Sequence, residues 1–308
     1  MKEVLVVYYS QTGQLFDILK SISATLQGEG VNLTFHEIIP KNAYNFPWDK
    51  EKFIDAFPES VLQIPTEIND PSPMVVDKKF DLVLLGIQVW YLSPSIPLNS
   101  FLKSEAAIKI LKNTPVVTVI GARNMWFQAQ EKVKKMLYGL QARLVGNIAL
   151  VDRHLNHISV ITIVYWLLHG KKDRMFGIFP RPGVSDADIV GAEKFGKPIR
   201  EALLSGDFES LQQQLLGLDA VKIRPALIST EKRGTLIFSK WASLVQKKAK
   251  GGPKQRKKWL TFFKYYLLFA IWIISPIVFI VFLLTYIPLY GKIKRDTKYY
   301  SSVGLKDK

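Results

Sequence analysis

Strand-like and helix-like segments alternate along the first 205 residues, and this alternation limits the possible folds more than any other feature. Candidate strands are the apolar, β-branched runs at residues 4–8, 31–38, 81–86, 116–120 and 144–151. Candidate helices, with apolar residues three and four positions apart, lie at 15–26, 96–111, 124–140 and 186–204. The pattern predicts an α/β fold: a doubly wound parallel sheet of five strands with helices on both faces.

Ligands of such sheets bind beyond the carboxyl ends of the strands, so the loops after the first, third and fourth strands are candidate sites. These loops read SQTGQL, GIQVWYLSPSIP and GARNMWFQ. The first places Ser10, Thr12 and Gly13 between a strand and a helix start, where free backbone amides and the helix dipole favour an anion. No lysine follows Gly13, so the nucleoside triphosphate loop is not matched. An ordinary strand–helix turn is the alternative interpretation.

Composition excludes several kinds of chemistry. The 308 residues contain no cysteine, which rules out disulfides, thiolate metal sites and cysteine nucleophiles. Four histidines leave little material for a metal centre, and we expect none. The chain starts with a strand and a loop rather than a signal peptide, so we expect this part of the protein in the cytoplasm.

Positive charge is concentrated at the C-terminal end, around an apolar segment. Residues 247–308 hold 14 of the 42 Lys/Arg and only 2 of the 26 Asp/Glu, and so carry most of the net charge of +16. Residues 265–290 contain no charged side chain, and about 20 apolar residues suffice to cross a bilayer. Tyrosine and tryptophan near its ends and the basic flanks suit interfaces with anionic lipid. The charge therefore indicates a membrane partner and not nucleic acid.

The segments around the sheet predict the organisation of the whole chain. We expect an α/β domain at 1–206 with insertions at 40–79 and 154–184, an amphipathic, basic linker at 207–258, a membrane segment at 259–291 and a basic tail at 292–308. The first insertion predicts one short helix. The second contains an uncharged run, 158–168, that is too short to span and indicates either a buried or an interfacial helix.

Two membrane arrangements are compatible with residues 265–290. Basic residues flank both ends, and the positive-inside rule favours the heavier N-terminal cluster in the cytoplasm. A single span with the tail across the membrane is the favoured arrangement, with a kink at Ser275–Pro276. A re-entrant hairpin with both ends inside is the alternative. In either case the protein is expected at the cytoplasmic face of a membrane, and a chain ending at Gln246 is expected to be soluble.

The three loops together resemble the FMN site of flavodoxin-like proteins. The resemblance covers residues 1–152 and 185–206 and implies a flavodoxin-like fold with FMN as cofactor. Leu15 departs from the family, which usually has a hydroxyl residue there. By this resemblance the cofactor-binding residues are Ser10, Gln11, Thr12, Gly13, Gln14, Leu15, Gln88, Val89, Trp90, Tyr91, Gly121, Ala122, Arg123 and Asn124. Trp90 and Tyr91 could instead cap the core, Arg123 could be a solvated charge, and Asn124 could serve only as a helix N-cap.

A longer set of motifs resembles flavodoxin-like dialkylresorcinol-condensing enzymes of bacterial dialkylresorcinol and flexirubin-type pigment clusters. The motifs are YYSQTGQL, VWYLSPSIP, VIGARNMW, LVGNIALVDRH and GKKDRMFGIFPRPGVSDADI. The resemblance implies an FMN-dependent oxidoreductase, an aromatase that oxidises a dialkyl cyclohexanedione made by a partner ketosynthase. Without cysteine, flavin oxidation is the step that the residues support. The aromatic and aliphatic residues of the two insertions suit a lipophilic substrate.

Catalytic candidates follow from this chemistry. His154 and His157 come just after the fifth strand, and histidine is the usual base near neutral pH. Arg123 would stabilise negative charge on a reduced ring. Either histidine could equally be an ordinary loop residue. The alternative functions are a membrane-associated NAD(P)H:quinone oxidoreductase of the same fold, an electron-carrier flavodoxin, and a membrane adaptor without flavin.

Overall fold

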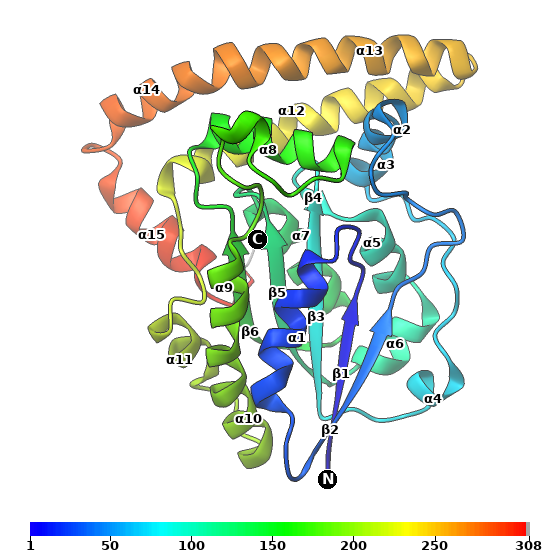
Figure 1. Cartoon of the computed structure of the whole chain (residues 1–308), viewed down its shortest axis with the longest axis vertical. Coiled ribbons are helices and arrows are strands. Elements are labelled where there is room, and N and C mark those ends of the chain that lie inside the picture. The colour runs from blue at the N-terminus through cyan, green and yellow to red at the C-terminus, as the bar shows by residue number, and fades with distance from the viewer. Residues whose placement is uncertain (306–308) are drawn as a thin grey trace.

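The computed structural model describes residues 1–305 and contains a parallel sheet in the strand order β2-β1-β3-β5-β6 (Figure 1). The strands are β1 (Lys2–Tyr8), β2 (Val31–Glu37), β3 (Leu82–Trp90), β5 (Pro115–Ala122) and β6 (Arg143–Val151). A two-residue strand, β4 (Ser93–Pro94), pairs only with the end of β3, in the antiparallel direction. With β4 set aside, this is the strand order of flavodoxin-like sheets, so the predicted fold is confirmed.

Close packing of the first helix against the sheet depends on small and apolar residues. Val4, Leu5, Val6 and Val7 of β1 have no exposed surface, because helices cover both faces of the sheet. Helix α1 (Gln14–Leu26) turns its own apolar side chains toward β3 and β5. A Cβ atom at Gly86 of β3 would lie 2.9 Å from the Leu19 side chain, so this glycine allows α1 to approach.

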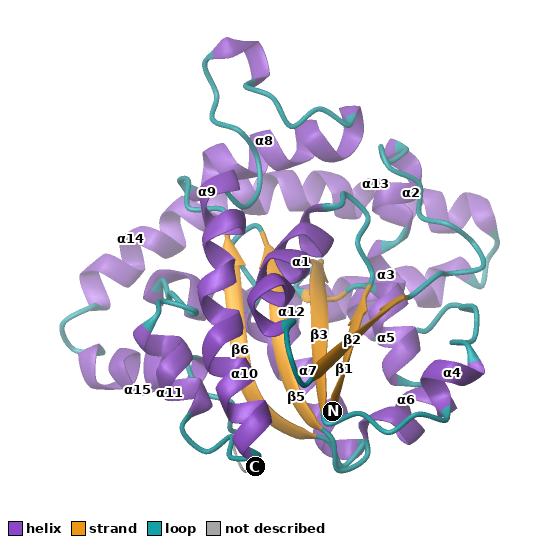
Figure 2. Ribbon diagram, turned by 60° about the horizontal axis from the view of Figure 1, so that its bottom comes forward, coloured by secondary structure: helices purple, strands orange, loops and turns teal. Residues whose placement is uncertain are grey.

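Helices cover the two faces of the sheet in separate layers (Figure 2). One layer holds α1 and α10 (Gly196–Ser205), preceded by α9 (Asp186–Val190) and the 3₁₀ helix η2 (Gly191–Phe195). The other holds α5 (Ile96–Leu102), α6 (Glu105–Leu111) and α7 (Phe127–Gly139). The helices predicted at 96–111 and 186–204 are therefore segmented. Ser104 separates α5 from α6, since its Oγ accepts the Ala107 N–H and caps α6.

Most of both insertions lies over the carboxyl ends of the strands, but residues 73–76 at the end of the first insertion lie at the opposite end of the sheet (Figure 1). Residues 40–79 contain α2 (Lys50–Asp55), α3 (Phe57–Leu62) and α4 (Pro73–Val76), where the sequence predicts one short helix. Residues 154–184 contain α8 (Asn156–His169) and the short η1 (Met175–Gly177). Helix α8 buries Ser159, Thr162 and Trp166 and exposes Val164. It is therefore half-buried, between the two predicted alternatives.

The segment predicted as a linker is packed helix. Helix α11 (Leu211–Gly217) lies against β6, and the amide of Ala149 donates to the Ala220 carbonyl at 2.8 Å. Helix α12 (Pro225–Ala249) runs across α3 and α7. Ile228, Ala242 and Val245 of this helix are buried, whereas Leu236 and Ile237 are exposed.

One continuous helix of 33 residues, Pro253–Thr285, is long and apolar enough to cross a membrane, and it is the only such helix in the described part of the chain. It comprises α13 (Pro253–Phe269), the π-helical η3 (Ala270–Ile274) and α14 (Ser275–Thr285). It runs antiparallel to α12 along one end of the molecule (Figure 1). A second core joins α13 to α12 and α3, with Phe57, Val61, Ala242, Val245, Leu260 and Phe263 buried.

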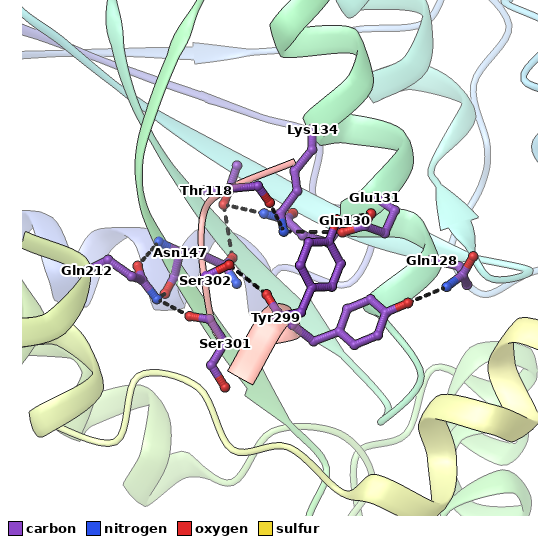
Figure 3. Close-up of polar contacts among 12 residues, drawn as sticks. Thr118, Gln128, Gln130, Glu131, Lys134, Asn147, Gln212, Tyr299, Ser301 and Ser302 are labelled. Carbon is purple, nitrogen blue, oxygen red and sulfur yellow. Dashed lines mark hydrogen bonds and ion pairs between the residues drawn. The ribbon is translucent and has the colours of Figure 1, made fainter. Parts of the chain in front are cut away.

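After α14 the chain returns to the sheet. Helix α15 (Tyr290–Tyr300) and the residues up to Gly304 pack on α7 and β6 (Figure 3). Gln212 connects them, since it accepts the Asn147 N–H at 2.7 Å and donates to the Ser301 carbonyl at 2.8 Å. Both ends of the apolar helix therefore lie on one body. Residues 306–308 of the predicted basic tail lie outside the described residues.

Candidate functional site

The loop between β1 and α1 presents backbone amides with no partner. In the described part of the chain, nothing accepts a hydrogen bond from the amides of residues 11–15. Ser10 Oγ accepts the Phe16 N–H at 3.3 Å, and the first helical bond runs from the Asp17 N–H to the Gly13 carbonyl at 3.0 Å. Gly13 has a φ of +81°, and a Cβ there would meet open space. The loop therefore offers free backbone amides at a helix N-terminus, which is the polarity that an anionic group requires.

Two glutamines of this loop hold the two insertions in place. Gln11 donates to the Tyr44 carbonyl at 3.2 Å and accepts the Trp48 indole N–H at 2.7 Å. Gln14 accepts the Val184 N–H at 3.0 Å and donates to the Val184 carbonyl at 3.1 Å. The loop predicted to bind an anion is thus hydrogen-bonded to both insertions.

A cavity adjoins the loop at the carboxyl ends of β1, β3 and β5. Its lining comes from the three predicted loops and from both insertions. The lining residues are Gln11, Thr12, Gln14, Leu15, Trp48, Phe53, Ala56, Gln88, Val89, Trp90, Tyr91, Gly121, Ala122, Arg123, Ile163, Trp166, Leu167 and Gly183. Eleven of the predicted cofactor residues are among them. Ser10 and Gly13 shape the loop without lining the cavity, and Asn124 lies behind the wall.

Aromatic side chains form one side of the cavity. Trp90 lies with its ring centroid 5.0 Å from Tyr44 and 5.2 Å from Trp48. The Tyr91 hydroxyl donates to the Phe53 carbonyl at 2.6 Å. Tyr91 and Leu92 have φ values of +47° and +61°, the conformation of a type I′ turn, which joins β3 to β4 without glycine. Trp90 therefore both closes the core and lines the cavity.

The end of β5 supplies a positive charge. Arg123 Nη1 donates to the Asn156 side-chain oxygen at 2.7 Å and to its carbonyl at 3.2 Å. Burial lowers the pKa of Arg123 to about 10, while nearby Asp152 and Glu231 oppose this shift, so the guanidinium stays charged at neutral pH. Asn124 also donates to Asn156, at 3.0 Å, and α7 begins three residues later. Asn124 is therefore not the N-cap of that helix.

Neither histidine lies at the cavity. His154 is exposed, and its backbone amide donates to Asp152 at 2.9 Å. The Nε2 atom of His157 lies 3.0 Å from the Ile271 carbonyl of η3, and its ring packs on Trp272 with centroids 5.4 Å apart. These positions give no geometry for either residue as a base toward a ligand in the cavity, in contrast to the prediction.

Some important residues were missed at the sequence level. The apolar composition of the two insertions indicated a site for a lipophilic substrate, but not which side chains would line it. Those that reach the cavity through tertiary packing are Trp48, Phe53, Ile163, Trp166 and Leu167. No sequence pattern indicated a role for Glu231 of α12, because this residue lies in the segment predicted as a linker. Its buried carboxylate accepts the Gln128 N–H at 2.7 Å at the start of α7, and burial raises its pKa to about 8.

One buried polar atom at the cavity is free to accept a hydrogen bond from a ligand. Gln88 Oε1 is buried without a hydrogen-bond partner in the described structure, and Gln88 lines the cavity. An unpaired buried acceptor is unfavourable unless a ligand donates to it. In the described residues there is no group of three or more His, Asp or Glu that could hold a metal ion.

No known protein family and no curated protein matches the chain. Among solved structures, a protein from Bacteroides eggerthii assigned as a flavoprotein aligns at 18% identity and a TM-score of 0.39, over 50% of this chain and 91% of its own. A flavoprotein from Lactobacillus acidophilus in complex with FMN aligns at 17% and 0.38, over 48% and 92%. Another assigned flavoprotein, from Bacteroides uniformis, aligns at 18% and 0.35, over 54% and 97%. The fold of this chain is defined by its strand order and not by these alignments.

Proposed function

We propose that this chain is an FMN-dependent oxidoreductase whose cavity holds the flavin ring together with a lipophilic substrate. The observation that carries the proposal is the juxtaposition of five unpartnered amides, at residues 11–15, with an aromatic-walled cavity at the point where strand order reverses between β1 and β3. Flavodoxin-like sheets bind FMN at this switch point.

The residues present fit the cofactor. The amides of residues 11–15 and the N-terminus of α1 would hold the phosphate, and Gly13 leaves the space open. Gln88 Oε1 would accept a hydrogen bond from a polar edge of the ring. Trp90 and Tyr91 would flank the ring, and Arg123 would place a fixed positive charge at the cavity wall. Bound there, FMN supplies an acceptor for a hydride.

The more specific proposal is aromatisation of a dialkyl cyclohexanedione in dialkylresorcinol biosynthesis. It rests on the motif resemblance and on the apolar cavity side chains from both insertions. The reaction removes two hydrogens from the ring, one as a hydride and one as a proton. A cyclohexane-1,3-dione enolises readily, so the protein needs to orient it and to stabilise an enolate oxygen, for which Arg123 is available. A ketosynthase would supply the dione, and the lipophilic product would leave into membrane lipid.

The test uses the purified full chain. Released flavin is identified after heat denaturation, and the protein is then incubated without oxygen with a dialkyl cyclohexanedione. Loss of flavin absorbance with formation of one resorcinol per flavin supports the proposal. Flavin that is reduced by NADPH and rapidly reoxidised by a soluble quinone, with no reaction of the dione, would instead identify the quinone oxidoreductase. A chain without flavin would refute both.

A further inference from the structure

We propose that the protein docks on one leaflet of an anionic bilayer without crossing it, with α13, η3 and α14 lying in the plane of the interface. This inference concerns a surface outside the cavity and does not depend on the proposed reaction.

The first observation is a long apolar surface with nothing covering it. The most apolar window of the 33-residue helix has no buried residue. Exposed apolar side chains extend from α13 to the start of α15: Phe262, Tyr265, Leu268, Phe269, Trp272, Ile273, Ile277, Phe279, Ile280, Val281, Leu283, Leu284, Tyr286, Ile287, Leu289 and Tyr290. A patch of this extent marks an interaction surface.

The second observation is that both ends of this helix are tied to the same body. At its N-terminal end, Arg256 pairs with Asp55 at 2.6 Å and with Glu59 at 2.9 Å, and the ring of Phe263 stacks on Phe57 with centroids 3.5 Å apart. These contacts hold α13 against α2 and α3 of the first insertion.

The C-terminal end is tied by the return of the chain. Lys232 of α12 pairs with Asp296 at 3.1 Å, Tyr300 is buried, and buried Lys134 of α7 donates to the Gly304 carbonyl at 3.0 Å. A transmembrane arrangement would have to break these contacts and carry the tail through the bilayer. An in-plane arrangement keeps all of them.

The middle of the helix is also held. The Ser275 N–H bonds to the Ala270 carbonyl in π-helical geometry, and Pro276 has no N–H, so the helix leaves the Ile271 carbonyl without a partner. His157 Nε2 lies 3.0 Å from this carbonyl. The second insertion therefore fixes the apolar helix where its own hydrogen bonding is interrupted, and α8 connects it to the cavity wall.

Basic residues beside the apolar surface favour an anionic lipid bilayer over an apolar protein surface as the partner. Arg233 of α12 and Lys292 of α15 line one groove together with Val281 and Phe282 of α14, and the acidic residue of this groove, Asp296, pairs with Lys232. Neither Arg233 nor Lys292 has an ion-pair partner in the described structure. Apolar side chains beside unpaired cations match the boundary between acyl chains and anionic headgroups.

The topology test exploits the absence of cysteine. Lys294→Cys on α15 and Lys109→Cys on α6 are each exposed. Sealed inside-out membrane vesicles from expressing cells are treated with an impermeant thiol reagent. Equal labelling of both variants without detergent is expected for docking on one side. Protection of Lys294→Cys until detergent is added would show a span and overturn the proposal.

The surface test uses flotation with vesicles of phosphatidylcholine with or without phosphatidylglycerol. The double variant Leu284→Glu/Ile287→Glu should bind at least about tenfold more weakly, since each side chain is largely exposed on the docking surface. Arg233→Glu/Lys292→Glu should lose a similar factor on anionic vesicles only. Met74→Glu, at an equally exposed apolar residue on α4 at the other end of the molecule, is the matched control.

Unchanged flotation of the Leu284/Ile287 variant, or a chain that self-associates through this surface and does not float, would overturn the proposal. Flavin content is measured in every sample. A chain that docks but contains no flavin would refute the proposed function and leave the docking inference standing.

Discussion

At the scale of single residues, Gly13 is the sharpest test of the flavin loop. Its φ of +81° is readily adopted only by glycine, so a branched residue would distort the loop whose amides we propose to hold the phosphate. Gly13→Val should therefore lose most of its flavin while the fold is retained, measured as released FMN per chain and by circular dichroism.

Gly206 provides the control, because it has a φ of +77° and open space at its Cβ, yet lies at the end of α10. Gly206→Val carries a similar backbone penalty, about 1 kcal/mol or more, and should keep its flavin. Full flavin occupancy in Gly13→Val would refute the assignment of this loop.

Glu231 makes the stability of the fold depend on pH. Burial raises its pKa from the ordinary 4.5 to about 8, so the folded state holds a proton that the unfolded state releases. Stability from this residue is therefore lost as pH rises from 4.5 to about 8, by at most about 1.4 kcal/mol per unit, and levels off above. Glu231→Gln retains an oxygen for the Gln128 N–H and should raise the melting temperature at pH 8.5 relative to the unmodified chain.

The same comparison at pH 5 serves as the control, since both side chains are then neutral in the folded protein and the melting temperatures should be close. A difference that does not change between pH 5 and pH 8.5 would mean that Glu231 ionises normally in the folded state.

Residue positions were predictable where the chemistry is local. The hydroxyl and glycine residues of the first loop could be identified because strand, loop and helix start are contiguous in sequence. The bonds from Gln11 to Trp48 and from Gln14 to Val184 join residues 37 and 170 positions apart, and no local pattern indicates them. The same holds for Glu231 and its distant partner, the Gln128 amide.

At the scale of elements, α8 connects the cavity to the apolar helix. His157→Ala removes the contact with the Ile271 carbonyl and the packing on Trp272, so α8 should exchange its amide hydrogens faster while flavin content is unchanged. Hydrogen exchange by mass spectrometry over residues 156–169 measures this. His169→Ala, on the same helix with only a local bond to Tyr165, is the control.

A selective, pH-dependent loss of turnover in His157→Ala, without faster exchange in α8, would instead restore this histidine as a catalytic base.

The elements of the sheet were predicted well because buried parallel strands are continuous apolar runs that read clearly in sequence. The helices that follow the sheet in the sequence were not predicted. Helix α12 has a mixed apolar, polar and basic composition that a flexible linker can share, and only its packing on α3 and α7 distinguishes the two. The helix predicted at 96–111 was divided by Ser104, whose capping bond ends one helix and starts the next.

At the scale of the whole molecule, the orientation of the apolar helix relative to a membrane could not be predicted from sequence. Length does not distinguish a spanning helix from an in-plane helix, because helices of both kinds can exceed 20 residues. The two arrangements differ in where the flanking segments lie. In this protein the segment after the helix packs on the α/β body, where Tyr300 is buried and the Gly304 carbonyl accepts a hydrogen bond from Lys134. The same contacts change the expectation for a chain ending at Gln246. It would lack Phe263 and Tyr300 from its two cores and should aggregate.

Two adjacent phenylalanines test this arrangement directly. Phe263 is fully buried and stacks on Phe57, whereas Phe262 is 45% exposed. If α13 packs on the body as described, Phe263→Ala should destabilise the protein by about 3–5 kcal/mol, because it leaves a cavity in the second core. Phe262→Ala should cost far less. Thermal unfolding of the full chain in mild detergent measures both. Were α13 instead surrounded by lipid, the two substitutions would have similar, small effects, so equal melting temperatures would contradict the packed arrangement.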